Sequence, residues 1–211
     1  VDLQHGENTM ASVGMMLQAL SSTPTTPMVR VPANLPVCIE RVLDLGAYGV
    51  IVPQVDTPAE AEAVVRSVRY APRGDRSFGP IRGAMYGGPD YFSASAQTLL
   101  TLVMIESARG LGHAREILSI DGVDAAFIGP ADLNISLGHS PDTPGFGATT
   151  EEGIATILRH ADEAGKFAGI HAFNVDEARR RIAQGFRFVT VMADTRMVRA
   201  QATEILGSLR D

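Results

Sequence analysis

The feature that most restricts the fold is a regular alternation of continuous apolar runs with stretches of helical periodicity. The apolar runs are rich in β-branched residues and occupy 28–31, 48–55, 98–106, 124–129, 167–173 and 186–193. The helical patterns occupy 9–20, 36–45, 58–69, 109–119, 150–164 and 175–184. Runs that are continuous rather than alternating are typical of strands covered on both faces, as in a parallel sheet. The order therefore predicts an α/β fold with right-handed crossovers.

Two architectures fit the number of strands. Six runs and a strand remnant at 1–3 make seven, which is compatible with a doubly wound sheet. They are equally compatible with a (β/α)8 TIM barrel, but such barrels run to about 250 residues. With 211 residues, a barrel would lack the first βα unit and most of strand 2. We expect this shortened barrel, as a single domain over 1–211, because no interdomain linker is visible.

Two segments rich in glycine and proline, 71–92 and 139–150, interrupt the pattern. Both are long for ordinary connections, so we expect functional loops or partner contacts there. Thr57 before Pro58 and Asn174 before 175 are helix start signals.

Composition excludes several classes of function. The net charge is −6, and no basic stripe is interleaved with aromatic residues, so nucleic acid is not expected as a partner. No apolar run approaches the roughly 20 residues that span a membrane, and no signal peptide is visible. The single cysteine, Cys38, cannot form an internal disulfide, which agrees with a cytoplasmic location.

Side chains that could act in catalysis or bind a metal ion follow the predicted strands. In parallel α/β folds, functional sites lie at the carboxyl ends of the strands. Glu106 and Asp132 are 26 residues apart (132 − 106), which is one βα repeat. They should project from neighbouring strand ends. Two such carboxylates suit Mg²⁺ or Mn²⁺, completed by water and substrate oxygens. The alternative is that each carboxylate caps the helix that follows it.

Further polar groups stand at the same ends. Arg30 ends the first run and would hold a carboxylate or an enolate oxygen; its alternative is a salt bridge with Glu106 or Asp132. His5 is a candidate proton carrier, or else a hydrogen-bonded structural histidine. His171 lies inside an apolar run, which favours a structural role.

The turn after the fourth strand exposes backbone N–H groups that would bind a substrate carboxylate, or it is simply a tight turn. Its residues are Gly129, Pro130, Ala131 and Asp132. Lys166, the only lysine, precedes a strand and so lies at the opposite edge. A Schiff-base mechanism therefore lacks its lysine, and metal-assisted enolate chemistry is favoured.

Six segments of the sequence together resemble those of a known enzyme family. The segments VDLQHG, VRVP, LDLGAYGVIVPQVDT, RYAPRGDRSFGP, MIES and FIGPADLNISLG stand in the order found in the HpcH/HpaI aldolases. The resemblance implies a class II, metal-dependent lyase that cleaves 4-hydroxy-2-oxo acids to pyruvate and an aldehyde. It also implies a modified TIM barrel of the phosphoenolpyruvate/pyruvate superfamily and a homo-oligomer, usually a hexamer with helix exchange.

The resemblance also implies residue roles. Glu106 and Asp132 would bind the divalent ion, Mg²⁺ or Mn²⁺ and in some members Co²⁺. Arg30 would hold the pyruvyl carbonyl or enolate oxygen, and His5 would transfer a proton with Asp2 in support. The backbone of Gly129, Pro130, Ala131 and Asp132 would receive the pyruvate carboxylate.

Some positions depart from the family pattern. Met104 replaces a glutamine that bonds substrate in many members, and Gln4 replaces a glutamate. Asp44 matches an aspartate linked to the catalytic histidine, but it ends a helix and would reach a site only across a subunit contact. Two alternatives stay open: a citrate-lyase-β or malyl-CoA type lyase, and a truncated, non-catalytic family member.

Overall fold

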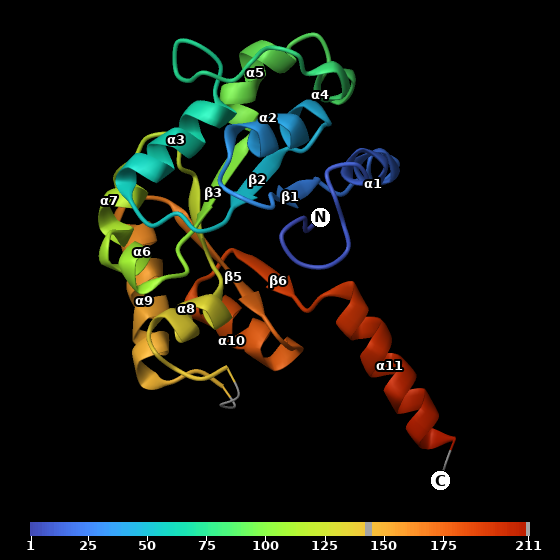
Figure 1. Cartoon of the computed structure of the whole chain (residues 1–211), viewed down its shortest axis with the longest axis vertical. Helices are drawn as coiled ribbons and strands as arrows, with labels where there is room; N and C mark the ends of the chain where they lie inside the picture. The colour runs from blue at the N-terminus through green and yellow to red at the C-terminus, as the bar shows by residue number, and fades with distance from the viewer. Residues whose placement is uncertain (142–144, 210–211) are drawn as a thin grey trace.

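The computed structural model describes residues 1–141 and 145–209. Its centre is a six-stranded parallel sheet in which every strand falls within a predicted run (Figure 1). The strands are β1 (Met28–Arg30), β2 (Gly49–Val52), β3 (Leu100–Met104), β4 (Ala125–Ile128), β5 (Phe167–Ala172) and β6 (Phe188–Val191).

The strand order is β1-β2-β3-β4-β5-β6, and all neighbours are parallel. A doubly wound sheet would reverse its order at a switch point. The sequential order in one direction therefore removes that alternative, and the sheet curls as part of a barrel does (Figure 1). At its first edge, Leu3 N donates to Arg30 O and Arg30 N to Val1 O, so the predicted strand remnant is confirmed as a bridge beside β1.

Helices follow the strands as the periodicity predicts. They are α1 (Val13–Leu20), α2 (Pro36–Asp44), α3 (Pro58–Val68), α4 (Ile81–Gly87), α5 (Tyr91–Thr98), α6 (Ala108–Gly112), α7 (Ala114–Ser119), α8 (Pro130–Ser136), α9 (Ala148–Glu163), α10 (Val175–Gln184) and α11 (Asp194–Ser208). Both start signals are confirmed: Thr57 forms a capping box with Glu60, and the Asn174 side chain accepts from Glu177 N. One predicted helix, 109–119, is divided at His113 into α6 and α7.

Two expectations of irregular structure are wrong in part. The segment 71–92 contains α4 and the start of α5, where Tyr91 is buried. Tertiary packing makes helices there despite the glycines and prolines that hide them in the sequence. Residues 139–150 include the start of α9 at Ala148, and 142–144 of that segment lie outside the described residues.

The two faces of the sheet differ. One face packs against the helices through side chains such as Val50, Val103 and Ile170. The inner face carries a smaller cluster made of strand residues alone: Ile51, Leu102, Met104, Ala125 and Phe127. Since side chains alternate along a strand, residues two or four positions further share that face.

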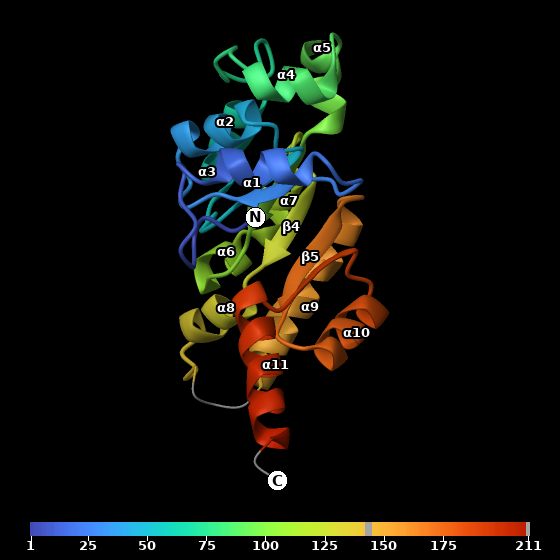
Figure 2. The ribbon, with the colours of Figure 1, turned by 90° about the vertical axis from the view of Figure 1, so that its right-hand side faces the viewer.

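This alternation decides what stands at the carboxyl edge. Arg30 follows Met28 by two positions, Glu106 follows Met104 by two, and Gly129 follows Phe127 by two. The inner face therefore ends in polar groups where the strands end. Figure 2 shows α6 and α8 at the end toward which the β4 arrow points.

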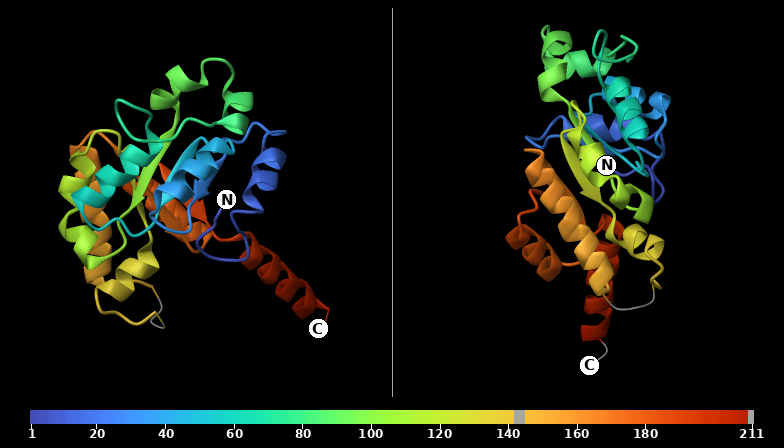
Figure 3. Two further views of the ribbon diagram at one scale, coloured as in Figure 1. Left: turned by 45° about the horizontal axis from the view of Figure 1, so that its top comes forward. Right: turned by 90° about the vertical axis from the view of Figure 1, so that its left-hand side faces the viewer.

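The last helix, α11, extends away from the other elements (Figures 1 and 3) and contains no buried residue. In the part of the chain that the structure describes, no helix is both long and apolar enough to cross a membrane.

Candidate active site

Glu106 is the centre of the candidate site. It directly follows β3 and is 4% exposed. Its Oε1 accepts from the backbone N of Gln54 at 3.0 Å, whereas its Oε2 is buried with no hydrogen-bond partner among the described residues. Gln54 takes a left-handed φ of 56° after β2, which a non-glycine residue adopts only where its surroundings hold it. The backbone donor is thus fixed toward one oxygen, and the other oxygen remains free.

Burial is the main cause of the raised pKa of Glu106. It raises the pKa of Glu106 from 4.5 to about 7, and the nearby charge of Asp132 adds to the rise. The Gln54 hydrogen bond and the charge of Arg30 act in the opposite direction but are smaller in sum. The carboxylate therefore lacks a counter-charge that its burial demands.

Gly129 leaves room for this carboxylate. A Cβ at position 129 would lie 2.3 Å from Glu106 Oε2 and 3.2 Å from Met104 Cε. Only glycine permits the free oxygen to lie against the turn between β4 and α8. Pro130 then begins α8, with Asp132 in its first turn.

The capping alternative for the two acids is wrong. The N-cap of α8 is Gly129, which makes no side-chain cap. The helix after Glu106 is capped by Ser107, whose hydroxyl accepts from Gly110 N. Neither Glu106 nor Asp132 is used as a helix cap, so both are left for another role.

Few side chains at the candidate site could bind a metal ion. Among residues 1–141 and 145–209, no group of three or more histidine, cysteine, aspartate or glutamate residues is arranged to hold a metal ion. What the edge offers is two carboxylates, Glu106 and Asp132, close enough for the charge of one to raise the pKa of the other. Mg²⁺ is often bound in this manner, by one or two carboxylates with water and substrate oxygens.

Arg30 does not pair with Glu106 or Asp132, so that alternative is wrong. It pairs with Asp2 in a bidentate arrangement, Nε to Oδ1 at 2.8 Å and Nη2 to Oδ2 at 2.5 Å. The two residues face each other across the bridge at the sheet edge, which brings their side chains to one side. Burial opposes the charge of Asp2, yet the bond from Arg30 and backbone N–H groups of Gln4 and His5 hold its pKa below the usual value.

The two predicted histidines behave differently. His5 is exposed in the loop after Leu3, and its ring makes no hydrogen bond to the described residues, which removes the structural alternative. His171, for which the sequence favoured a structural role, lies on β5 with Nδ1 2.9 Å from Thr190 Oγ1. Burial and then the charge of Arg30 lower the pKa of His171. The charge of Arg30 thus acts on His171 as well as on Glu106.

Two other predicted residues lie at the amino edge. Asp44 ends α2, as predicted, and accepts from Arg76 Nη2 at 2.7 Å. Lys166 precedes β5 and its Nζ donates to Ile120 O at 2.6 Å. The lysine is thus engaged at the opposite edge from Glu106.

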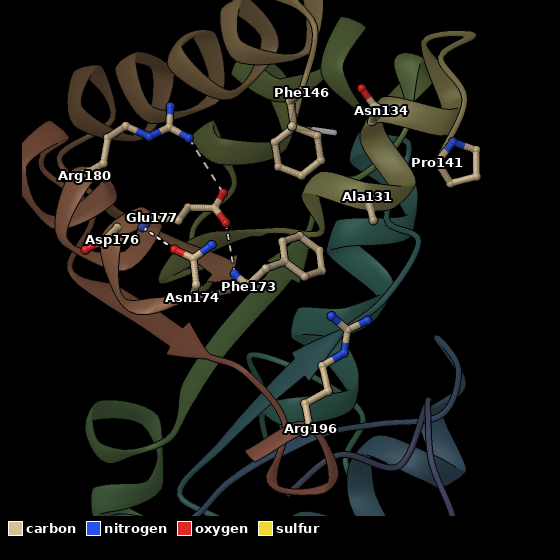
Figure 4. Close-up of a pocket in the computed structure, with 11 residues that line it drawn as sticks. Ala131, Asn134, Pro141, Phe146, Phe173, Asn174, Asp176, Glu177, Arg180 and Arg196 are labelled. Carbon is tan, nitrogen blue, oxygen red and sulfur yellow. Dashed lines mark hydrogen bonds and ion pairs between the residues drawn. The ribbon is translucent and has the colours of Figure 1, made fainter. Parts of the chain in front are cut away.

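A cavity of about 800 Å³ opens beside the turn that starts α8. Its walls include Ala131, Phe146, Phe173 and Arg196, from four separate segments (Figure 4). The guanidinium carbon of Arg196 lies 5.6 Å from the centre of the Phe173 ring. No local pattern reveals such a wall, because its members come together only in the folded chain.

A curled parallel sheet whose carboxyl edge gathers acids, an arginine and a cavity is the arrangement typical of α/β enzymes. The family comparison agrees: the model described as HpcH/HpaI aldolase/citrate lyase matches residues 1–200. The chain belongs to this family.

Individual relatives support the assignment. The hydroxypyruvate/pyruvate aldolase of Rhizorhabdus wittichii is 40% identical over 210 residues, covering 100% of this chain and 84% of the relative. The 4-hydroxy-2-oxo-heptane-1,7-dioate aldolase of Klebsiella pneumoniae is 37% identical over 213 residues, covering 99% and 78%. A crystal structure of a family protein from Burkholderia cenocepacia superposes with a TM-score of 0.91 at 33% identity, covering 100% and 84%. The chain is an enzyme of the carbon–carbon lyase class.

Proposed function

We propose that the chain is a divalent-metal-dependent aldolase that cleaves or forms 4-hydroxy-2-oxo acids, with pyruvate and an aldehyde as the other partners. One observation carries the metal dependence: the buried, unpartnered Oε2 of Glu106, for which Gly129 leaves room and near which Asp132 places a second carboxylate. The names of relatives at 37–40% identity support the reaction.

Glu106 and Asp132 would hold the ion, and their hard oxygen donors fit Mg²⁺ or Mn²⁺. When bound, the ion supplies positive charge to the oxygens of the 2-oxo acid as the enolate of pyruvate develops. This ion would also supply the counter-charge that Glu106 lacks.

Side chains and backbone groups of the protein would bind the substrate and transfer the proton. Arg30, held by Asp2, would direct its donors at the carbonyl oxygen that becomes the enolate oxygen. Donors fixed in advance stabilise that charge more than they stabilise the ketone, which lowers the barrier to C3–C4 cleavage. Backbone N–H groups of residues 129–132 would bind the carboxylate, and His5 would carry a proton to or from the substrate.

We also propose that the sheet is part of the (β/α)8 barrel of the family, in one domain over 1–211, and that the chain forms a homo-oligomer such as a hexamer. Supporting the oligomer, α11 has no buried residue and exposes Val198, Ile205 and Leu206 at 70%, 50% and 56%. Cys38 is a free thiol, in keeping with a cytoplasmic enzyme.

The test is release of pyruvate from a 4-hydroxy-2-oxo acid with Mg²⁺ or Mn²⁺ present. We expect chelator to abolish release and Asp132→Ala to lower it by about a thousandfold, since a lost metal ligand removes several kcal/mol of stabilisation. Asp75→Ala is the control, because Asp75 pairs with Arg66 on the surface. Undiminished release in Asp132→Ala, or no effect of chelator, would contradict the proposal. Faster turnover of a CoA thioester than of the free acid would favour the citrate-lyase-like alternative.

A further inference from the structure

His171 has no role in the mechanism above, yet it stands beside the candidate site. In the β4–β5 pairing, Phe127 is opposite Gly169 and Ile128 is opposite Ile170. The next positions along these two strands are Gly129 and His171. His171 also follows Phe167 by four positions and therefore shares the inner face of the sheet. It is thus placed next to the glycine against which Glu106 Oε2 lies.

The ring of His171 is fixed from two directions. Its Nδ1 lies 2.9 Å from Oγ1 of Thr190, its register partner on β6. It packs against the Phe173 ring in a T-shaped arrangement, with 4.9 Å between centroids and an interplanar angle of 85°. Its Nε2 makes no hydrogen bond to any residue that the structure describes. A side chain held this firmly, with one nitrogen left over, is suited to contact a ligand.

The surroundings of the ring indicate which part of a ligand it meets. On one side is Gly129, whose turn would receive the pyruvate half of the substrate. On the other side is Phe173, which lines the 800 Å³ cavity. The charged groups that act on the ring are Arg30, Glu177, Arg196 and Asp2. Burial lowers the pKa of His171, which favours the neutral form of the ring.

We propose that His171 is a substrate-contacting residue: its Nε2–H donates a hydrogen bond to the C4 oxygen, which is the hydroxyl of the 4-hydroxy-2-oxo acid and the carbonyl oxygen of the aldehyde. The inference rests on the proposed aldolase function. Thr190 donates its hydroxyl proton to Nδ1 and thereby keeps the ring proton on Nε2. The aldehyde half then extends past Phe173 into the cavity.

Two reactions of the metal-loaded protein distinguish loss of the His171 hydrogen bond to the C4 oxygen from damage to the whole site. Cleavage of 4-hydroxy-2-oxopentanoate uses both halves of the substrate. Exchange of the methyl protons of pyruvate for deuterium, followed by NMR with Mg²⁺ present, uses the pyruvate half alone. His171→Phe should lower kcat/KM for cleavage by about tenfold to a hundredfold and leave exchange within about twofold, because one hydrogen bond to the aldehyde half is lost.

Further variants sharpen the test. His171→Gln retains an N–H donor and should recover most of the lost cleavage. Thr190→Val leaves the ring but frees Nδ1, so cleavage should fall by severalfold while exchange is unchanged. His160→Phe is the matched control, since His160 lies in the last turn of α9, toward the opposite edge of the sheet, and it should retain both reactions.

Equal losses of cleavage and exchange in His171→Phe, or full cleavage activity in His171→Phe or Thr190→Val, would overturn the contact. A wild-type protein that cleaves and exchanges, beside such variants, leaves the proposed function intact. A wild-type protein that does neither, with Mg²⁺ and with Mn²⁺, overturns the proposed function and this inference with it.

Discussion

Two carboxylates of this chain, Glu106 and Glu151, lie in opposite electrostatic surroundings. Glu151 on α9 accepts from Arg181 through both oxygens, at 2.6 and 2.9 Å, and from Arg180 at 3.0 Å. The Arg181 side chain is fully buried. Glu106 is the more deeply buried acid, yet among the described residues it has one backbone hydrogen bond on one oxygen and no partner for the other.

The pKa values of the two carboxyl groups are shifted in opposite directions because their hydrogen-bond partners differ. Burial opposes the charge of both. For Glu151, hydrogen bonds from Arg181 and Arg180 overcome burial and lower the pKa. For Glu106 no described residue makes a comparable contact, and the pKa rises to about 7. The comparison teaches that the same residue type stabilises the fold between α9 and α10 and weakens it at the carboxyl edge, where the missing partner is expected from outside the chain.

The largest effect is expected from Glu106→Gln. Loss of the charge should reduce aldolase activity by about a thousandfold. The same change should stabilise the metal-free protein, because a pKa shift from 4.5 to about 7 corresponds to about 3 kcal/mol of unfavourable charge at pH 8. Urea unfolding at pH 8 with chelator measures this gain. A variant less stable than the wild type would show that the carboxylate contributes to the fold.

Arg181→Leu should have the opposite outcome. It leaves Glu151 without its buried partner, which typically destabilises a protein by about 3–5 kcal/mol. Urea unfolding should show this loss, while kcat per folded molecule stays unchanged because neither Arg181 nor Glu151 lines the cavity beside α8. The double variant Arg181→Leu with Glu151→Leu should recover part of the loss. A stable single variant would mean that the ion pair is dispensable.

The smallest effect is the pH dependence of stability, where the two acids act with opposite sign. The pKa of Glu151 is depressed in the folded state, so its contribution is complete above 4.5 and is lost as the pH falls through the folded value. The pKa of Glu106 is raised, so the metal-free fold weakens as the pH rises from 4.5 through about 7. Glu151→Gln and Glu106→Gln should both approach wild-type stability near pH 3, where the carboxyl groups become protonated, and depart from it in opposite directions toward pH 8, with Glu151→Gln less stable and Glu106→Gln more stable than the wild type. Departure in the same direction at pH 8 would contradict the assignment.

Much of the fold was predictable because it depends on local patterns. Six apolar runs became six strands, and Thr57 and Asn174 began helices as expected. The βα spacing also predicted that Glu106 and Asp132 lie near each other, and the charge of Asp132 does reach Glu106. Hydrophobic periodicity and the spacing of strands are local properties of the sequence, so they can be recognised without knowledge of the folded chain.

The partners of the site residues were not predictable, because they come from distant segments. The ion pair of Arg30 with Asp2 depends on a bridge between residues 28 positions apart. The left-handed Gln54, which binds Glu106 from 52 positions away, has no composition signal. Arg181 is the last of three consecutive arginines, and nothing in that run distinguishes it as the one that the structure buries. For His171 a signal existed, since it stands in phase with Phe167 on the inner face.

The most direct test of the central claim is Mn²⁺ binding measured by electron paramagnetic resonance, with the wild type, Glu106→Gln and Glu151→Gln compared at pH 8. If Glu106 is kept without a partner in order to bind a cation, the wild type and Glu151→Gln each take up one ion per chain. Glu106→Gln then takes up none at a Mn²⁺ concentration that saturates the wild type. Equal binding by Glu106→Gln and the wild type would contradict the claim.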